Sequence, residues 1–448
     1  MKKGIKYCLL AAWLVTVAPW PSPAQIGPTL QLSLKQAVEI ALGPEGNARV
    51  QLAEEMIRQA QARSAQSRAA LLPDFEGSVG QQNLTRNLAA FGIRIQIPVP
   101  GFHFPELVGP FNVFDARATV TQNILDFSSI RRYQASRTGV ELAKSESEST
   151  RSQVTDQVAR AYLAGLRAEA TFETAKANVE LSDALLKLAL NQKAAGTGTG
   201  IEVTRSQVQL ANERQRLLVA ENERERAHLE LLRVLGLKLK AGLELTDKLS
   251  YVSVENIGLE SAIQTALQSR PELKAQQRRE ENARLNHSAV KMERLPSLVA
   301  VADYGSIGSS IEHAFPTRTF GASLRVPVLD GGRRDARRAE SLSQYRQERI
   351  RTSDLREQIE LDIRLALDAL RSAEAQVKAA EEGLSLAENE LAQARRRYQA
   401  GVASGLEVTD AQTRLERARE NRIAALFNHN LARIDLGTAT GTIQRFMP

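Results

Sequence analysis

The stretch AGVASGLEVTDAQ, residues 400–412, repeats an earlier stretch of the same chain, AGTGTGIEVTRSQ, residues 195–207, at a shift of 205 positions. An internal repeat of this kind decides the architecture of a chain. Two further pairs of segments match at or near the same shift: Gly236 with Gly441, and Ile124-Leu125-Asp126 with Val328-Leu329-Asp330. Further upstream, Leu72-Pro73 and Leu295-Pro296 match in the same order along the chain. We therefore interpret the chain as two copies of one structural unit, residues 25–250 and 251–448.

Each copy is predicted to hold short helices, a strand pair, a very long helix and a return helix. The predicted bounds of the last three are about 74–123, 128–193 and 201–236 in the first copy, and 297–328, 331–398 and 406–436 in the second. Proline breaks helix interiors, and none occurs between Pro110 and Pro271 or between Pro327 and Pro448. Each long helix of about 65 residues would measure roughly 100 Å.

A seven-residue pattern of large apolar side chains and alanine runs along both long helices. It is formed in the second copy by Ile363, Leu370, Val377, Leu384, Leu391 and Tyr398, with Ala366, Ala373, Ala380, Ala387 and Ala394. The first copy has Val158, Gly165, Phe172, Val179 and Leu186, with Ala161, Ala168, Ala175, Ser182 and Ala189. This pattern predicts closely packed, left-handed coiled pairs. By itself it leaves open a coiled-coil rod without a lumen.

Alternating side chains in the predicted strands favour a channel over a rod. Phe114, Ala116, Ala118 and Val120 alternate with polar residues, and the second copy repeats the pattern at Phe320, Ala322, Leu324 and Val326. Segments of about ten residues with one apolar face suit a transmembrane barrel, although a half-buried soluble sheet would look similar. The smallest known barrels have about eight strands, and an open edge is not tolerated in lipid. Several chains would therefore have to combine their strands, and their long helices would then enclose a tunnel.

The first residues have the pattern of a secretory signal. Lys2, Lys3 and Lys6 precede the apolar run from Leu9 to Val17, and the small residues of Ser22-Pro23-Ala24 predict cleavage after Ala24. The single cysteine, Cys8, lies inside this segment, so no disulfide is expected. The formal charge of +7 falls by three when the signal lysines are removed. Such mild basicity does not indicate nucleic-acid binding.

The sequence resembles the TolC-type outer-membrane efflux proteins, or outer membrane factors, across essentially the whole mature chain. The specific part is the second turn, from Tyr398 through Gly401 and Ser404-Gly405 to Gln412. The resemblance implies a mainly α fold with a small β part: a homotrimer whose four strands per chain form a twelve-stranded barrel in the outer-membrane lipid. It also implies a coiled-coil tunnel through the periplasm that docks to an adaptor (membrane fusion) protein and an inner-membrane pump.

The resemblance also points to site residues at the helical tips. The turns contain Gly196 and Gly200 in the first copy and Tyr398, Gly401 and Gly405 in the second. In the family, acidic residues of the second return helix ring the periplasmic gate, and the positions that match are Glu407 and Asp410. Their i, i+3 spacing places both on one helix face. They could instead be ordinary first-turn carboxylates that the helix dipole favours.

No catalytic, cofactor or metal site can be argued from the sequence. The glycines of residues 196–200 follow a predicted helix and lack the Lys-Ser/Thr ending of a phosphate loop. The five histidines show no paired ligand spacing. The expected protein is therefore no enzyme but an outer-membrane exit duct for small toxic molecules. An outlet for secreted proteins and a periplasmic coiled-coil adaptor or spacer are the alternatives.

Overall fold

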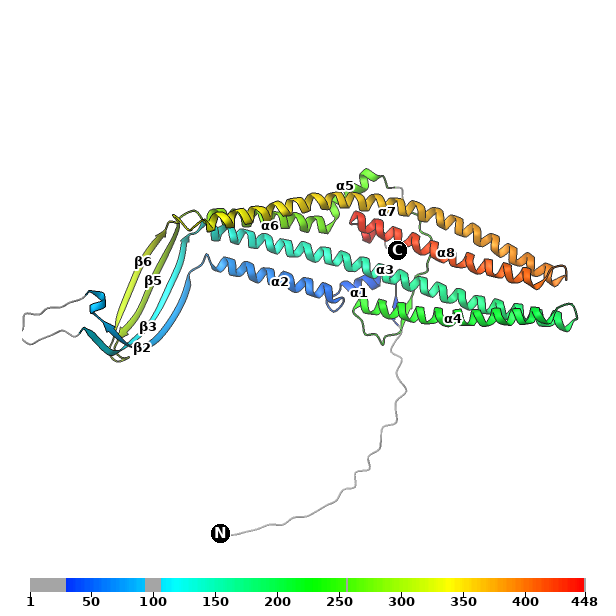
Figure 1. Cartoon of the computed structure of the whole chain (residues 1–448), viewed down its shortest axis with the longest axis horizontal. Helices are drawn as coiled ribbons and strands as arrows, with labels where there is room; N and C mark the ends of the chain where they lie inside the picture. The colour runs from blue at the N-terminus through cyan, green and yellow to red at the C-terminus, as the bar shows by residue number, and fades with distance from the viewer. Residues whose placement is uncertain (1–29, 93–105, 255–256, 447–448) are drawn as a thin grey trace, which may run out of the picture.

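The computed structural model describes residues 30–92, 106–254 and 257–446. The molecule is elongated, with helices along most of its length and a curved β-sheet at one end (Figure 1). The predicted signal peptide, residues 1–24, lies outside the described residues. No helix in the described part of the chain has the length and apolar character needed to cross a membrane.

Two helices, α3 (Phe127–Ala194) and α7 (Arg333–Gln399), extend from the sheet to the opposite tips (Figure 1). With 68 and 67 residues they are each roughly 100 Å long. Two shorter helices lie along each long helix, one near the sheet and one near the tip. The helices near the sheet are α2 (Ala48–Ala69) and α6 (Pro271–Met292), and those near the tips are α4 (Gly200–Leu235) and α8 (Gly405–Thr440). Two antiparallel hairpins, α3–α4 and α7–α8, therefore form the far end of the molecule.

The predicted heptad positions form the contacts between these helices. On α7 the large side chains from Ile363 to Tyr398 are buried, except Leu384, which packs at the margin of a core cluster. Four of the five predicted alanines are buried, and Ala380 is partly buried. A small side chain every seven residues lets the neighbouring helix approach closely. The heptad pattern is thus confirmed as the packing face of α7.

A small core at the middle of the molecule was not predicted in detail. There β1 (Leu30–Leu32) pairs in parallel with β4 (Leu243–Leu245) beside the short helix α1 (Leu34–Leu42), whereas the short helix α5 (Leu259–Ser269) packs in a separate cluster against α7 and α8. The buried Tyr162 hydroxyl lies 2.9 Å from the Leu32 carbonyl and 2.7 Å from the Asp247 carboxylate. Strands of three residues give too short an alternation to be recognised in a sequence.

The second sheet has four antiparallel strands in the order β2-β3-β5-β6. They are β2 (Asp74–Asn87), β3 (Leu107–Leu125), β5 (Ser297–Gly308) and β6 (Ala314–Arg325). Because β3 pairs with β5, the strand pairs of the two copies form one continuous sheet. Its outer strands, β2 and β6, each have one side without a partner strand among the described residues. Single-turn helices η1 (Ala89–Phe91) and η2 (Ile443–Phe446) complete the described elements.

Several predicted boundaries differ from the observed ones for identifiable reasons. The second strand pair stops at Arg325 rather than 328, just before Pro327, and α7 starts at Arg333 because Gly331 and Gly332 have positive φ. Helix α8 continues beyond the predicted 436 to Thr440, where Gly441 adopts a left-handed conformation. Gly236 ends α4 in the same way. Glycine is the usual residue for such a helix end.

Candidate gate at the helical tips

Both hairpins turn through a left-handed glycine. Gly196 has φ 76° after α3, and Gly401 has φ 72° after α7. In each turn an amide just past the glycine reaches back to the helix: Thr197 N–H donates to the Gln192 carbonyl at 3.0 Å, and Val402 N–H to the Arg397 carbonyl at 3.1 Å. This pairing caps the free carbonyls at a helix end. Gly200 and Gly405 are the first residues of the return helices.

Glu202 ties the two hairpin tips together. One carboxylate oxygen accepts a hydrogen bond from the Thr199 amide of its own turn, at 3.0 Å. The other accepts one from the Gly405 amide at the start of α8, also at 3.0 Å. These two backbone hydrogen bonds lower the pKa of Glu202, because they stabilise the charged form. Sequence reasoning assigned no role to Glu202, and the structure gives it a bridging contact.

The two predicted gate residues lie in unequal surroundings. Glu407 is 205 positions after Glu202, yet its side chain does not cap its own helix; it pairs with Arg397 of α7 at 3.1 Å. Asp410 is exposed one turn further along α8. Tyr398 is buried against the apolar side chains of the tips, and this burial raises its pKa. The predicted turn and gate residues therefore all gather at the free end of the hairpins.

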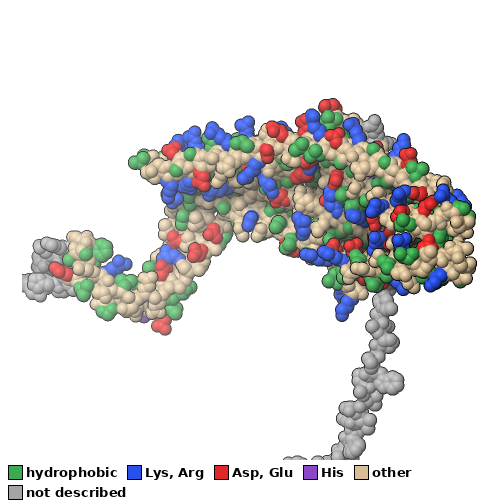
Figure 2. Space-filling model, turned by 45° about the vertical axis from the view of Figure 1, so that its right-hand side comes forward, with side chains coloured by type: hydrophobic (Ala, Val, Ile, Leu, Met, Phe, Trp, Pro, Cys, Tyr) green, Lys and Arg blue, Asp and Glu red, His purple; other side chains and the backbone are tan. Residues whose placement is uncertain are grey.

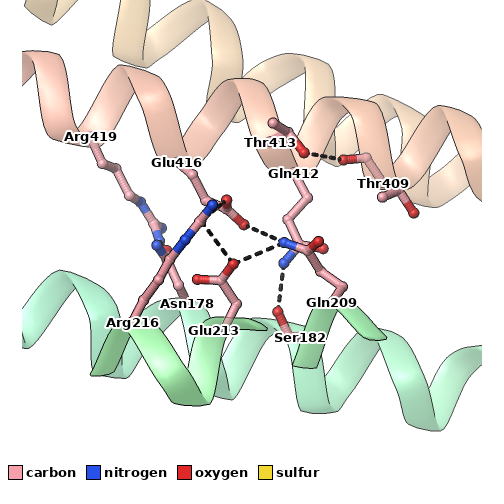
Figure 3. A network of polar contacts seen from close by, with 10 residues as sticks. All are labelled: Asn178, Ser182, Gln209, Glu213, Arg216, Thr409, Gln412, Thr413, Glu416 and Arg419. Carbon is pink, nitrogen blue, oxygen red and sulfur yellow. Dashed lines mark hydrogen bonds and ion pairs between the residues drawn. The ribbon is translucent and has the colours of Figure 1, made fainter. Parts of the chain in front are cut away.

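A polar network lies between α4 and α8, inward from the tips (Figure 3). The Gln209 amide donates to Glu213 at 2.9 Å and to Glu416 at 3.2 Å. The Arg216 guanidinium bridges the same two carboxylates, at 3.0 and 2.8 Å. Both glutamates are buried, with residue exposures of 1% for Glu213 and 3% for Glu416. Burial, and then the neighbouring charge of Glu416, raises the pKa of Glu213 to about 7.

Two further polar contacts connect α3 to α8 beside this network (Figure 3). The Gln412 amide donates to the Ser182 hydroxyl at 2.6 Å, and the Arg419 guanidinium donates to the Asn178 side chain at 2.7 Å. A signal for the network is present in the sequence, because the two copies of the repeat differ at its two buried glutamates. At the 205-residue shift Glu213 corresponds to Ala418, and Glu416 corresponds to Ala211.

Several charged side chains of the sheet at the other end lie on one of its two faces. Arg117 on β3 pairs with Asp115 of the same strand at 2.9 Å and with Asp303 of β5 at 3.1 Å. The opposite face has an apolar row, since Phe75, Val120, Ala302 and Phe320 are successive partners across the strands. Phe75 and Phe320 are each 75% exposed. The register agrees with the predicted alternation in β2, β3 and β6, whereas β5 has Val299, Val301 and Ile307 on the same face as Asp303.

Within the described ranges, no group of three or more His, Cys, Asp or Glu side chains is arranged to hold a metal ion. Among the described residues, the contacts of the tips are helix caps and ion pairs.

Paired helices of about 100 Å, an open antiparallel sheet at one end and capped turns at the other are the architecture of TolC-like channels. The chain belongs to the outer membrane efflux protein family, whose family model matches residues 44–237 and 262–442. The resemblance predicted from the second turn is thereby confirmed. This is a family of channels rather than enzymes.

Particular relatives agree with this assignment. The chain is 24% identical over 418 residues to the pyoverdine export outer membrane protein OpmQ of Pseudomonas putida, covering 91% of this chain and 85% of OpmQ. It is 24% identical over 389 residues to the toluene efflux pump outer membrane protein TtgF of another P. putida strain, covering 84% and 76%. The crystal structure of the outer membrane protein VceC of Vibrio cholerae matches with a TM-score of 0.75 at 19% identity, over 91% of this chain and 96% of VceC.

Proposed function

We propose that this protein is the passive outer-membrane exit duct of a tripartite efflux system. Three copies would form a tunnel that conducts small toxic molecules from an inner-membrane pump across the periplasm and the outer membrane. A periplasmic adaptor protein would connect the tunnel to the pump. The relatives OpmQ and TtgF are named for pyoverdine export and toluene efflux, which favours small molecules as cargo over secreted proteins.

The observation that carries this proposal is the open sheet with an exposed apolar face. In the part of the chain that the structure describes, the edge strands β2 and β6 each have a row of backbone donors and acceptors with no partner strand. Aromatic and aliphatic side chains of the same sheet, such as Phe75, Val79 and Phe320, are exposed, and contact with lipid is more favourable for them than contact with water. Pairing β6 of each chain with β2 of the next removes all edges. Three chains with four strands each would give a twelve-stranded barrel, within the range of known barrels.

The two faces of the sheet then have distinct roles. The row that contains Phe75 and Phe320 would contact lipid, and the row that contains Arg117 and Asp303 would line the lumen. Lumen-facing residues of such barrels are polar, because the interior is filled with water. Basic and acidic side chains are interspersed over the helical part of the molecule (Figure 2), as a wall in contact with water requires. A coiled-coil spacer or adaptor would need no such sheet.

At the other end, the tips of the three chains would converge on a gate. Glu407 is already paired with Arg397, so the negative charge left at the mouth comes mainly from the exposed Asp410. Three Asp410 carboxylates around a narrow passage attract cations. We therefore assign the cation-attracting ring to Asp410 and a structural role at the tip to Glu407.

Conductance through planar lipid bilayers tests the gate. Asp410→Asn should lower cation selectivity and relieve block by multivalent cations, and Glu407→Gln should change selectivity less, because its charge is already compensated. Glu55→Gln is the control, since it removes an exposed carboxylate on α2, far from the tips (Figure 1). An Asp410→Asn channel with the selectivity and block of the parent would refute the ring and leave Asp410 as a helix-start residue.

A further inference from the structure

The two hairpins of one chain meet at their tips, and the internal repeat predicts an equivalent contact at a second place. Inside the chain, Glu202 of the first hairpin accepts a hydrogen bond from the Gly405 amide of the second. The positions that correspond at a shift of 205 are Glu407 and Gly200. In the single chain these two have no such contact: Glu407 pairs with Arg397, and the space where Gly200 would carry a side chain is open.

We propose that this junction is repeated between neighbouring chains of the trimer, where Glu407 of one chain accepts a hydrogen bond from the Gly200 amide of the next. The proposal rests on the trimeric channel proposed above. In a ring of three chains the first and second hairpins alternate, so the free side of each second hairpin meets a first hairpin. Glu407 can keep Arg397 on one oxygen, Oε1, and bind the amide with the other.

An uncovered apolar side chain marks the same face. Leu181 of α3 packs into the core cluster that joins α3 to α7 and α8 at the internal junction. Its counterpart on α7, Leu386, is 63% exposed in the single chain. The matching helix α4 of a neighbouring chain also presents exposed apolar side chains, including Leu218 at 66%. A second copy of this chain would cover both by repeating the internal packing.

The charges at this seam between chains are complementary. Tyr398 and Glu202 line one small cavity at the internal junction. At the seam the residue that replaces Tyr398 is Lys193 of the next chain, an exposed cation in the last turn of α3. It would lie beside Glu407, as Tyr398 lies beside Glu202. A carboxylate would thus meet both an amide and an ammonium group across the seam.

The seam lacks the buried polar contacts that fix the internal junction. Asn178, Ser182 and Glu416 all take part in hydrogen bonds between the two hairpins of one chain (Figure 3). Their counterparts at the shift are Gly383, Ala387 and Ala211, which have no polar side chain. The seam therefore depends on exposed ionic contacts at the tip, which are weak and sensitive to salt. We infer that the tips separate first at the seams, where the contacts are weaker.

Disulfide cross-linking tests the seam with a matched internal control. The mature chain has no cysteine if the segment that contains Cys8 is removed. A Cβ on Gly405 would lie 3.3 Å from Cγ of Glu202, which is compatible with a disulfide between these positions. The control variant is Glu202→Cys with Gly405→Cys, which should cross-link within one chain and keep the mass of a single chain. Glu407→Cys with Gly200→Cys should link chain to chain, up to covalent trimers on a non-reducing denaturing gel.

The outcomes separate this proposal from the channel proposal. If the detergent-solubilised variant is a trimer and the control oxidises, but Glu407→Cys with Gly200→Cys stays at the mass of one chain, the seam is wrong and the channel stands. If the parent is monomeric in mild detergent, both proposals fail.

Charge reversal supplies a second test that needs no cysteines. Lys193→Glu and Glu407→Lys should each raise the open probability of the channel by on the order of tenfold, because three seams act together. The double exchange should restore much of the closed state. Effects that simply multiply in the double variant would show that the two residues do not interact.

Discussion

Glu213 offers a pH-dependent prediction that can be worked from the structure. Its carboxyl lies between α4 and α8, with Glu416 and Glu420 on α8 and Arg216 on its own helix as the charged neighbours. The pKa of Glu213 is raised from 4.5 to about 7, mainly by burial. As the pH rises from about 4.5 to about 7, the unfolded chain releases this proton while the folded chain retains it. The contribution of Glu213 to stability is therefore complete below about pH 4.5 and is lost as the pH rises to about 7.

The loss is on the order of 3 kcal/mol per chain, since each pKa unit corresponds to about 1.4 kcal/mol. Glu213→Gln keeps the size of the side chain and an oxygen that can accept from Gln209 and Arg216, but it cannot ionise. The variant should therefore lose most of this pH dependence. The thermal unfolding midpoint, followed by circular dichroism in detergent at one heating rate, should fall for the parent between pH 5 and pH 8 and change much less for the variant.

The control for this experiment is Glu221→Gln, which removes an exposed carboxylate from the same helix. It should retain the pH dependence of the parent. Identical slopes of midpoint against pH for the parent and Glu213→Gln would refute the reasoning, because they would mean that Glu213 titrates alike in the folded and unfolded chains.

Two further predictions concern the helices and the sheet. Ala387→Leu should destabilise the folded chain by about 1 to 3 kcal/mol, because Ala387 is buried at the contact of α7 with its neighbours. Ala380→Leu should cost less, because Ala380 is only partly buried. The yield of trimer and its melting temperature measure both effects, and unchanged values for Ala387→Leu would mean that no helix packs closely there. Gly92 lies at the end of the sheet remote from the helices, so Gly92→Cys should react with a membrane-impermeant thiol reagent on intact cells, whereas Ser78→Cys inside β2 should be protected. Protection at Gly92 with labelling at Ser78 would contradict the orientation.

The long elements were predictable because one strong pattern repeats many times. The heptads of α7 run from Ile363 to Tyr398 within a helix of 67 residues that contains no proline, and the shift of 205 supplied independent support from α3. The strands were predictable from alternation, but the end of the second strand pair and the start of α7 were misplaced by a few residues, because Pro327 and the positive φ of Gly331 and Gly332 set them. The pairing of β3 with β5, which joins the two copies into one sheet, has no local signal. It depends on where the long helices place the strands.

The tips were predictable in composition but not in contacts. Sequence reasoning placed Gly196, Gly401 and Glu407 at the turns, yet treated the two carboxylates of α8 as equivalent. The structure separates them, because Arg397 reaches only Glu407. The network of Glu213 and Glu416 was not predicted, because it lies where the two copies of the repeat differ. Positions where the two copies differ in polarity therefore indicate which contacts between helices differ from one copy to the other.

The central claim is that several copies of this chain close their sheets into one barrel in the outer membrane. The most direct test is the mass of the mature protein after membrane fractionation and extraction in mild detergent, measured by light scattering with the detergent contribution removed. The account predicts recovery from the outer membrane as a particle of three chains that forms conducting pores in planar bilayers. Recovery from the soluble periplasm with the mass of one chain would contradict it.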